Sequence, residues 1–144
     1  TIKRSLSVLE NGHILGIFPD GGVSYNLLSK PKKGAVFLSN LGSAPIVPMS
    51  IYGAERAWEG AFKGIRSRVC INIGKPFGPH KISGSKKEKE ALLRKIGNEM
   101  MWRIASLLPK NRRGHFTNEK TIETLQKQNR IVPDHHHYFK STPE

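Results

Sequence analysis

Apolar residues recur at helical spacing in three segments, which are residues 2–11, 33–43 and 85–109. The first segment ends at Asn11-Gly12 and the second at Gly42, both typical stop signals for a helix. The third is the longest, with Ser85 as a candidate N-cap and Pro109 at its end. Its apolar stripe consists of Leu92, Leu93, Ile96, Met100, Ile104 and Leu107. The pattern therefore predicts three helices.

Three further apolar runs predict short strands over residues 13–18, 45–53 and 67–74. Pro48 interrupts the second run, which favours an edge position or a strand end. In the third run, alternation places Val69, Ile71 and Ile73 on one face of the strand. The order helix, strand, helix, strand, strand predicts an α/β fold with a mainly parallel sheet and flanking helices.

The regular pattern decays after residue 108. We therefore expect residues 1–108 to form the α/β part and residues 109–144 to be a basic, partly disordered tail, with one polar helix over residues 118–130. Trp102 projects from the opposite side of the long helix to the apolar stripe. We therefore expect it to be exposed in this chain, and either to anchor at a membrane interface or, as we favour, to pack on chain that is missing from this sequence.

The charge of the chain is strongly positive. Lys and Arg number 24 against 11 Asp and Glu, which gives a formal net charge of +13. Residues 75–144 are the more basic part. The partner classes that fit are nucleic acid, an anionic bilayer and a phosphate-bearing substrate, and charge alone leaves all three open.

The chain has one cysteine, Cys70, so it forms no internal disulfide. No apolar run approaches the roughly 18 residues of a spanning helix, which predicts a soluble or membrane-peripheral protein. The chain begins with Thr1, and residues 1–11 look like the last turns of a helix already under way. We expect a fragment or a processed product.

A loop with special backbone requirements follows the first apolar run, in the sequence Pro19-Asp20-Gly21-Gly22. One interpretation is a tight turn, because Pro presets φ and Gly tolerates a positive φ. The other is a substrate loop, because glycines let an anion approach backbone N–H groups at a strand end. The local sequence leaves both open.

Three sequence blocks, taken together, favour the substrate loop. They are Phe18 to Ser24, Lys32-Lys33-Gly34-Ala35, and Ile46 to Ile51. Together they resemble the glycerolipid acyltransferases, the 1-acylglycerol-3-phosphate acyltransferase family. That family has a Phe-Pro-Glu-Gly-Thr-Arg-Ser block, a basic-basic-Gly-Ala helix start and a Val-Pro-Val-x-Ile strand in this order. The resemblance covers residues 3–78 and implies an incomplete acyltransferase domain.

The resemblance implies acyl transfer from a thioester, on coenzyme A or acyl carrier protein, to the hydroxyl of a lysophospholipid or glycerol phosphate in phospholipid biosynthesis. It implies no other cofactor, and a peripheral location on the cytoplasmic face of an anionic membrane. The substrate-binding residues it implies are Phe18, Pro19, Asp20, Gly21, Gly22, Ser24, Lys32, Lys33 and Pro48.

Some positions depart from the family pattern. Asp20 stands where Glu is usual, and Gly22-Val23 where Thr-Arg is usual. Val23 cannot bind a phosphate, so an acceptor that carries a phosphate needs another cation to bind it. The cations nearest in sequence are Lys30, Lys32 and Lys33.

The chain also lacks the family's catalytic His-x4-Asp motif. In that motif the histidine acts as general base on the acceptor hydroxyl. We therefore assign no catalytic residue, expect the motif to lie upstream of Thr1, and expect the 144 residues to be inactive alone.

Two alternatives come from other classes. A nucleic-acid-binding module would use the basic run at residues 110–116 and the lysine-rich helix, although no helix-turn-helix, RNP or zinc-finger pattern is present. A non-catalytic lipid-binding remnant would need only the charge. Consecutive histidines at residues 135–137 make a poor preformed metal site, so no metal is expected.

Overall fold

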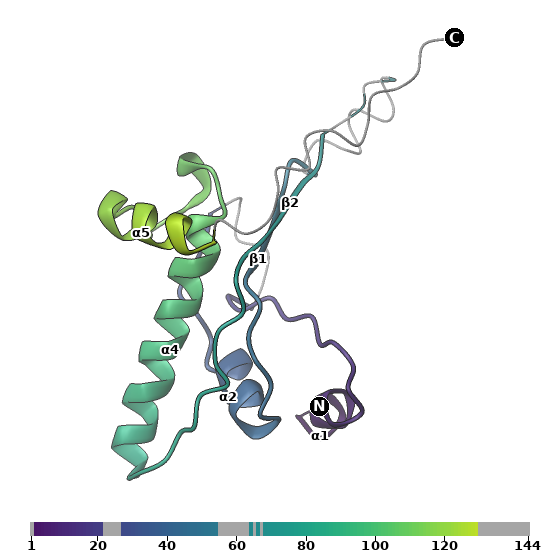
Figure 1. Ribbon diagram of the computed structural model, residues 1–144, viewed down its shortest axis with the longest axis vertical. Coiled ribbons are helices and arrows are strands. Elements are labelled where there is room, and N and C mark those ends of the chain that lie inside the picture. Colours follow the sequence, from purple (N-terminus) through teal and green to yellow (C-terminus); the bar gives the residue numbers. More distant parts are fainter. Residues whose placement is uncertain (1, 22–26, 55–63, 65, 67, 130–144) are drawn as a thin grey trace.

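The computed structural model describes residues 2–21, 27–54, 64, 66 and 68–129. One long helix, α4, runs beside a pair of strands, and shorter helices lie at its two ends (Figure 1). The elements are α1 (Ile2–Glu10), α2 (Gly34–Leu41), β1 (Met49–Tyr52), β2 (Cys70–Ile73), α4 (Lys86–Ser106), the 3-10 turn η1 (Lys110–Arg112) and α5 (Glu119–Asn129).

Helix α4 begins at Ser85, the N-cap that the sequence predicts, and this cap is a capping box. The Ser85 hydroxyl accepts from the backbone N–H of Glu88 at 3.3 Å, and the Glu88 carboxylate accepts from the backbone N–H of Ser85 at 2.7 Å. These bonds lower the pKa of Glu88. The C-terminal half of α4 supplies five of the ten buried apolar residues of the described core, and Met101 is fully buried there.

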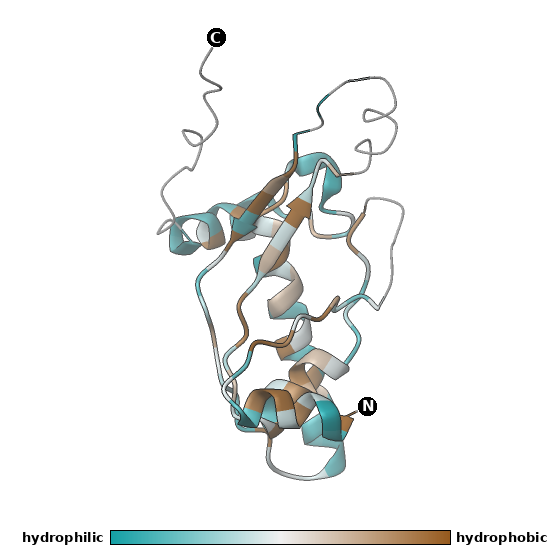
Figure 2. Cartoon of the chain, turned by 90° about the vertical axis from the view of Figure 1, so that its right-hand side faces the viewer, coloured by the Kyte–Doolittle hydropathy of each residue, from teal (hydrophilic) through white to brown (hydrophobic). Residues whose placement is uncertain are grey.

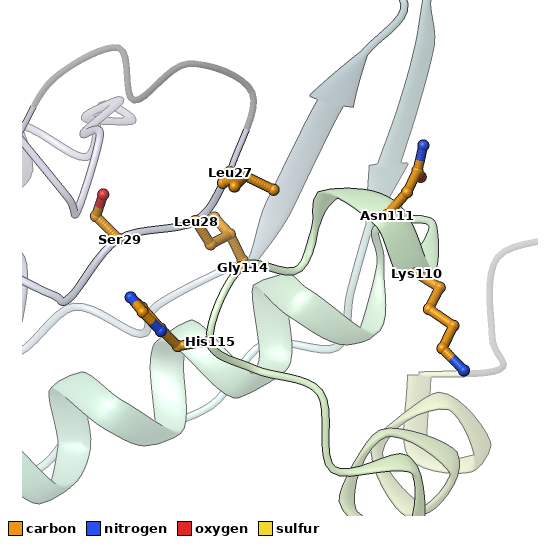
Figure 3. Close-up of a pocket in the computed structure, with 7 residues that line it drawn as sticks. All are labelled: Leu27, Leu28, Ser29, Lys110, Asn111, Gly114 and His115. Carbon is orange, nitrogen blue, oxygen red and sulfur yellow. The ribbon is translucent and has the colours of Figure 1, made fainter.

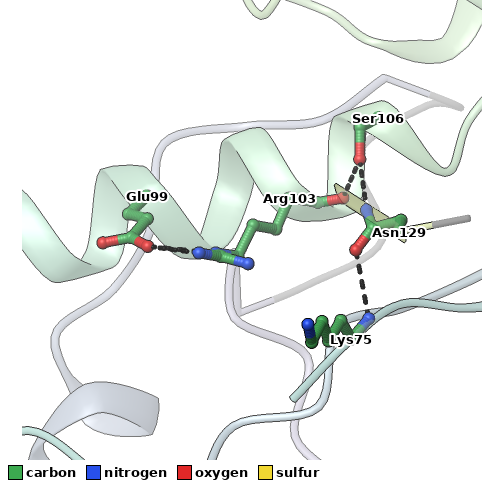
Figure 4. Close-up of polar contacts among 5 residues, drawn as sticks. All are labelled: Lys75, Glu99, Arg103, Ser106 and Asn129. Atoms are coloured by element: carbon green, nitrogen blue, oxygen red, sulfur yellow. Dashed lines mark hydrogen bonds and ion pairs between the residues drawn. The ribbon is translucent and has the colours of Figure 1, made fainter. Parts of the chain in front are cut away.

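Helix α5 lies across the C-terminal half of α4. Figure 4 shows how its last residue ties three segments together: Asn129 accepts from the Lys75 backbone N–H at 3.1 Å and donates to the Ser106 hydroxyl at 2.9 Å. Ile122 of α5 and Phe116 before it are buried in the same core. These residues lie beyond residue 108, where the sequence predicts a tail; the division of the chain there stays a prediction.

The strands β1 and β2 form an antiparallel ladder in which Met49 is paired with Ile73 and Ile51 with Ile71. These four side chains lie on the outer face of the ladder and are about half exposed. Figure 2 shows apolar residues along both strands. We call these four residues the outer face. Two strands do not define a fold class, so the α/β class with a mainly parallel sheet stays a prediction.

The inner face of the ladder meets the end of α4 through polar groups. Ser50 and Asn72 both donate to the backbone carbonyl of Leu107, at 3.0 and 2.8 Å. A backbone carbonyl has two lone pairs, so this part-buried oxygen can accept from both donors. The ladder is therefore attached to the helix by hydrogen bonds as well as by packing.

Several expectations are confirmed and two are wrong. Helices form close to the predicted ranges, and Pro48 does precede the start of a strand. The strand expected over residues 13–18 does not form, because within the described part of the chain no strand pairs with it. Trp102 is half-buried and packs edge-on against Phe116, with ring centroids 5.1 Å apart, so it does not project outward from the chain.

Candidate functional site

The segment Phe18-Pro19-Asp20-Gly21 forms a tight turn. The backbone N–H of Gly21 donates to the carbonyl of Phe18 at 3.1 Å, and Gly21 has φ +74°. Proline in the second position and glycine in the fourth are the residues that such a turn favours. The turn predicted for residues 19–22 is therefore observed at Pro19, Asp20 and Gly21, while Gly22 and Ser24 lie outside the described residues.

Lys32 is held against this turn at two points. Its backbone N–H donates to the Pro19 carbonyl at 2.7 Å. Its side chain crosses the α-carbon of Gly21 so closely that a Cβ there would lie 2.5 Å from Nζ and 2.6 Å from Cδ. The positive φ is what favours glycine at position 21, and the end of the Lys32 side chain occupies the space that a Cβ would take.

A hollow of about 440 Å³ opens beside the turn, between α1, residues 15–21 and the start of α2. This volume lies within the usual range of ligand pockets, about 300–1,000 Å³. Its polar side chains among the described residues are Ser5 and Lys32. The apolar side of the hollow is formed mainly by Leu15, Ile17, Phe18, Ala35 and Leu38. We call this the turn hollow.

The neighbouring lysine points elsewhere. Lys33 Nζ lies 3.1 Å from the Glu90 carboxylate of α4, and it does not line the turn hollow. The hydrogen bond and positive charge of Lys33 lower the pKa of Glu90. The structure thus separates two adjacent lysines, of which one faces the turn hollow and the other joins α2 to α4.

The remaining predicted residues lie at different distances from the hollow. Asp20 is half-buried in the turn, and within the described part of the chain its carboxylate has no hydrogen-bond or ion-pair partner. Lys30 is exposed and does not line the hollow. Pro48 is fully buried and its carbonyl accepts from the Gly74 N–H at 2.8 Å, so the structure does not bring it to the turn hollow.

The turn hollow has the groups for binding rather than for proton transfer. Among the described residues that line it, none is His, Cys, Asp or Glu. It therefore offers one cation, one hydroxyl and an apolar wall. Such a surface can hold and orient an anionic, partly apolar molecule, but it offers no general base.

A second hollow, of about 460 Å³, lies where residues 27–29 meet the loop at residues 110–115 (Figure 3). The Leu28 N–H donates to the Arg112 carbonyl at 3.4 Å, and Gly114, with φ +58°, passes directly beneath the Leu28 backbone. Lys110 at its rim is bound to Glu119 at 2.7 Å, which lowers the pKa of that carboxyl. The sequence pattern does not predict this contact, because residues 110–115 lie in the segment expected to be a tail. Gly114 and Phe116 are the residues there that could have indicated packed chain.

The comparisons with known proteins give one relative. The chain is 34% identical over 77 residues to a 1-acyl-sn-glycerol-3-phosphate acyltransferase of Bacillus subtilis (strain 168). The match covers 54% of this chain and 37% of the relative, so the chain spans well under half of the relative's length. No protein-family model and no solved structure matches. The chain is thus a distant, partial relative of an acyltransferase, which suggests a transferase of that family.

Two other kinds of feature are absent from the part of the chain that the structure describes. No group of three or more His, Cys, Asp or Glu side chains is arranged to hold a metal ion there. None of the helices in the same residues is both long and apolar enough to cross a membrane.

Proposed function

We propose that the chain forms the acceptor-binding part of a glycerolipid acyltransferase. The reaction moves an acyl group from a thioester, on coenzyme A or acyl carrier protein, to the hydroxyl of a lysophospholipid or glycerol phosphate. The observation that carries this proposal is that two of the three family-like blocks meet at the turn hollow, joined by the bond from the Lys32 N–H to the Pro19 carbonyl. The 34% identity over 77 residues to an acyltransferase supports the same reaction class.

The proposed role of these residues is binding. Acyl transfer to a hydroxyl needs a base to take its proton, and positioned general-base catalysis contributes about 10²–10⁴ in rate. The sequence has no His-x4-Asp pair, and the described lining of the turn hollow has no base. We therefore expect no turnover from the 144 residues alone.

A chimera tests the reaction class. In it, the 77 matched residues of the Bacillus subtilis acyltransferase are replaced by the matching segment of this chain. We expect the purified chimera to consume an acyl thioester in the presence of 1-acyl-sn-glycerol-3-phosphate. A chimera that folds cooperatively but consumes no thioester would contradict the proposal, and the parent enzyme is the positive control.

Asp20 separates a substrate loop from a turn that is only structural. In the chimera, Asp20→Asn is expected to lower turnover while leaving the melting temperature unchanged, because within the described residues the carboxylate has no partner to lose. A purely structural turn predicts the reverse, a lower melting temperature with unchanged turnover per folded molecule. Measuring both quantities on the same preparation distinguishes the two.

We also propose that the protein works at an anionic membrane surface. The first half of α4 carries exposed basic side chains, which are Lys86, Lys87, Lys89, Arg94 and Lys95. We expect sedimentation with vesicles rich in anionic lipid, weakening as salt screens the charges. Duplex DNA at the same ionic strength is the comparison, and tighter binding to DNA at physiological salt would favour a nucleic-acid-binding module.

A further inference from the structure

The outer face of the ladder is an apolar surface that stays about half exposed. We propose that this face binds the same face of a second copy of the chain, so that two ladders pack sheet on sheet in a closed, two-fold symmetric dimer. The inference concerns assembly, and it does not depend on the reaction proposed above.

The two faces of the ladder have the reverse of the usual polarity. In an antiparallel sheet with one face in water, the apolar side chains face the core and the polar ones face the solvent. Here the polar residues Ser50 and Asn72 face inward and donate to the Leu107 carbonyl, and Ser50 is only 4% exposed. The aliphatic side chains of the same strands point away from the core. The pattern is therefore typical of a strand pair whose outer side is also covered.

The apolar surface continues past the four residues that define the outer face. Val47 and Val69 stand two residues before Met49 and Ile71, and they are 50% and 46% exposed. Isolated apolar residues on a surface need no explanation. Six that adjoin one another on two paired strands form a contiguous patch, and patches of this kind mark interaction sites.

The distribution of charge favours a second copy over a bilayer. Surfaces that lie on anionic lipid combine apolar side chains with Lys and Arg, but residues 44–54 and 69–74 include no charged residue. The basic side chains proposed above for membrane contact belong to α4, on the inner side of the ladder, and α4 lies behind the ladder in Figure 2. Copies of a chain with a net charge of +13 also repel one another, so they can meet only where basic side chains are sparse.

The size of the patch sets the strength of the contact. Half of the surface of six aliphatic side chains is on the order of 500 Å² per copy, so that a dimer would bury about 1,000 Å² in total. This is close to the lower limit for a specific interface. Paired sheets pack about 10 Å apart, with the side chains of both faces interdigitating. We therefore expect a weak dimer, with a Kd of about 10–100 µM.

The test is the mass of the 144-residue chain in solution, measured by sedimentation equilibrium. Concentrations run from about 1 to 300 µM, to span the expected Kd, in about 0.5 M salt, which screens the repulsion between copies. We expect one copy at the low end, two copies at the high end and no larger species, because a face that binds itself is used up in the dimer. Pairing through the free edges of β1 or β2 would instead continue past two copies.

A matched pair of variants makes the result specific. Ile71→Lys places a charge in the patch of both copies, and it should weaken association by about tenfold or more. Ile14→Lys makes the same change at a side chain that is 96% exposed and outside the ladder, and it should leave the Kd unchanged. Circular dichroism and the melting temperature check folding. Should Ile71→Lys not fold, Ile71→Thr keeps the β-branched shape that strands favour and should weaken association about fivefold.

Three results would overturn the inference: one copy at every concentration, a mass that rises past two copies, or equal weakening by Ile71→Lys and Ile14→Lys. Two others would overturn it by assigning the face to another occupant. A chain that stays monomeric and loses vesicle binding with Ile71→Lys has its outer face in the bilayer. A chimera that stays monomeric and loses its fold with Ile71→Lys covers the face with other segments of its own polypeptide.

Discussion

The two ends of the molecule are built differently. At the packed end, the second half of α4 is covered by α5, by Phe116 and by the ladder, and Met101, Ala105 and Ile122 have at most 1% of their surface exposed. At the open end, α1 has no buried residue and the turn hollow is lined by partly exposed side chains. Stability is therefore concentrated at one end and the candidate binding site lies at the other. Substitutions at the site should change binding while leaving unfolding nearly unchanged.

Met101→Ala should give the largest effect, because it removes a fully buried side chain of the packed end. We expect a loss of about 2–5 kcal/mol in the free energy of unfolding. Urea unfolding followed by far-UV circular dichroism measures it. The matched variant at the open end is Leu9→Ala in α1, where the side chain is only partly buried. An equal loss of unfolding free energy in this variant would contradict the difference between the two ends.

The shared acceptor at Leu107 gives the next effect. Asn72→Ala or Ser50→Ala alone should cost about 1 kcal/mol, because the other donor still satisfies the carbonyl. The double variant should cost more than the two single losses added together, since it leaves the carbonyl without either donor. Simple additivity in a double-mutant cycle would show that the carbonyl finds water when the ladder is altered.

Ser85→Ala tests the start of α4. Loss of the capping box should cost about 0.5–2 kcal/mol. We expect hydrogen exchange to quicken in the first turns of α4 while the amides near Met101 stay protected, because local opening need not involve the packed end. Equal acceleration along the whole helix would show that the two ends unfold as one unit.

The smallest effect should come from the exposed pair between Lys33 and Glu90. The folded-state pKa of Glu90 is lowered from its ordinary value of 4.5, so the pair stabilises the fold above that value and loses its contribution as the pH falls through the folded pKa. Glu90→Gln should therefore flatten the acid side of the melting-temperature profile slightly. A variant profile that matches the parent at neutral pH as well as in acid would show that the pair is silent in solution.

The sequence predicts some features of this arrangement well. The helix ranges follow from apolar spacing and from local stop signals such as Asn11-Gly12 and the Ser85 cap. The turn at residues 18–21 follows from the backbone preferences of proline and glycine. All of these depend on residues that are close together in the chain.

What could not be predicted depends on distant contacts. Residues 13–18 have the apolar character of a strand, but a strand needs a partner, and its own sequence does not supply one. Lys32 and Lys33 are equivalent by local pattern; they differ because Glu90, far along the chain, pairs with one of them. Phe116 was assigned to a tail because its partner, Trp102, is contributed by another element.

The outer face of the ladder has a consequence for the colloidal behaviour of the protein. Its four half-exposed aliphatic side chains attract similar surfaces, while a net charge of +13 keeps molecules apart. The range of that repulsion shrinks from about 10 Å at 0.1 M salt to about 3 Å at 1 M. The protein should therefore disperse well in dilute buffer and self-associate as salt is added, opposite to a protein held together by ion pairs. Vesicle sedimentation across a salt series therefore needs a lipid-free control at each salt concentration, so that self-association is not counted as vesicle binding.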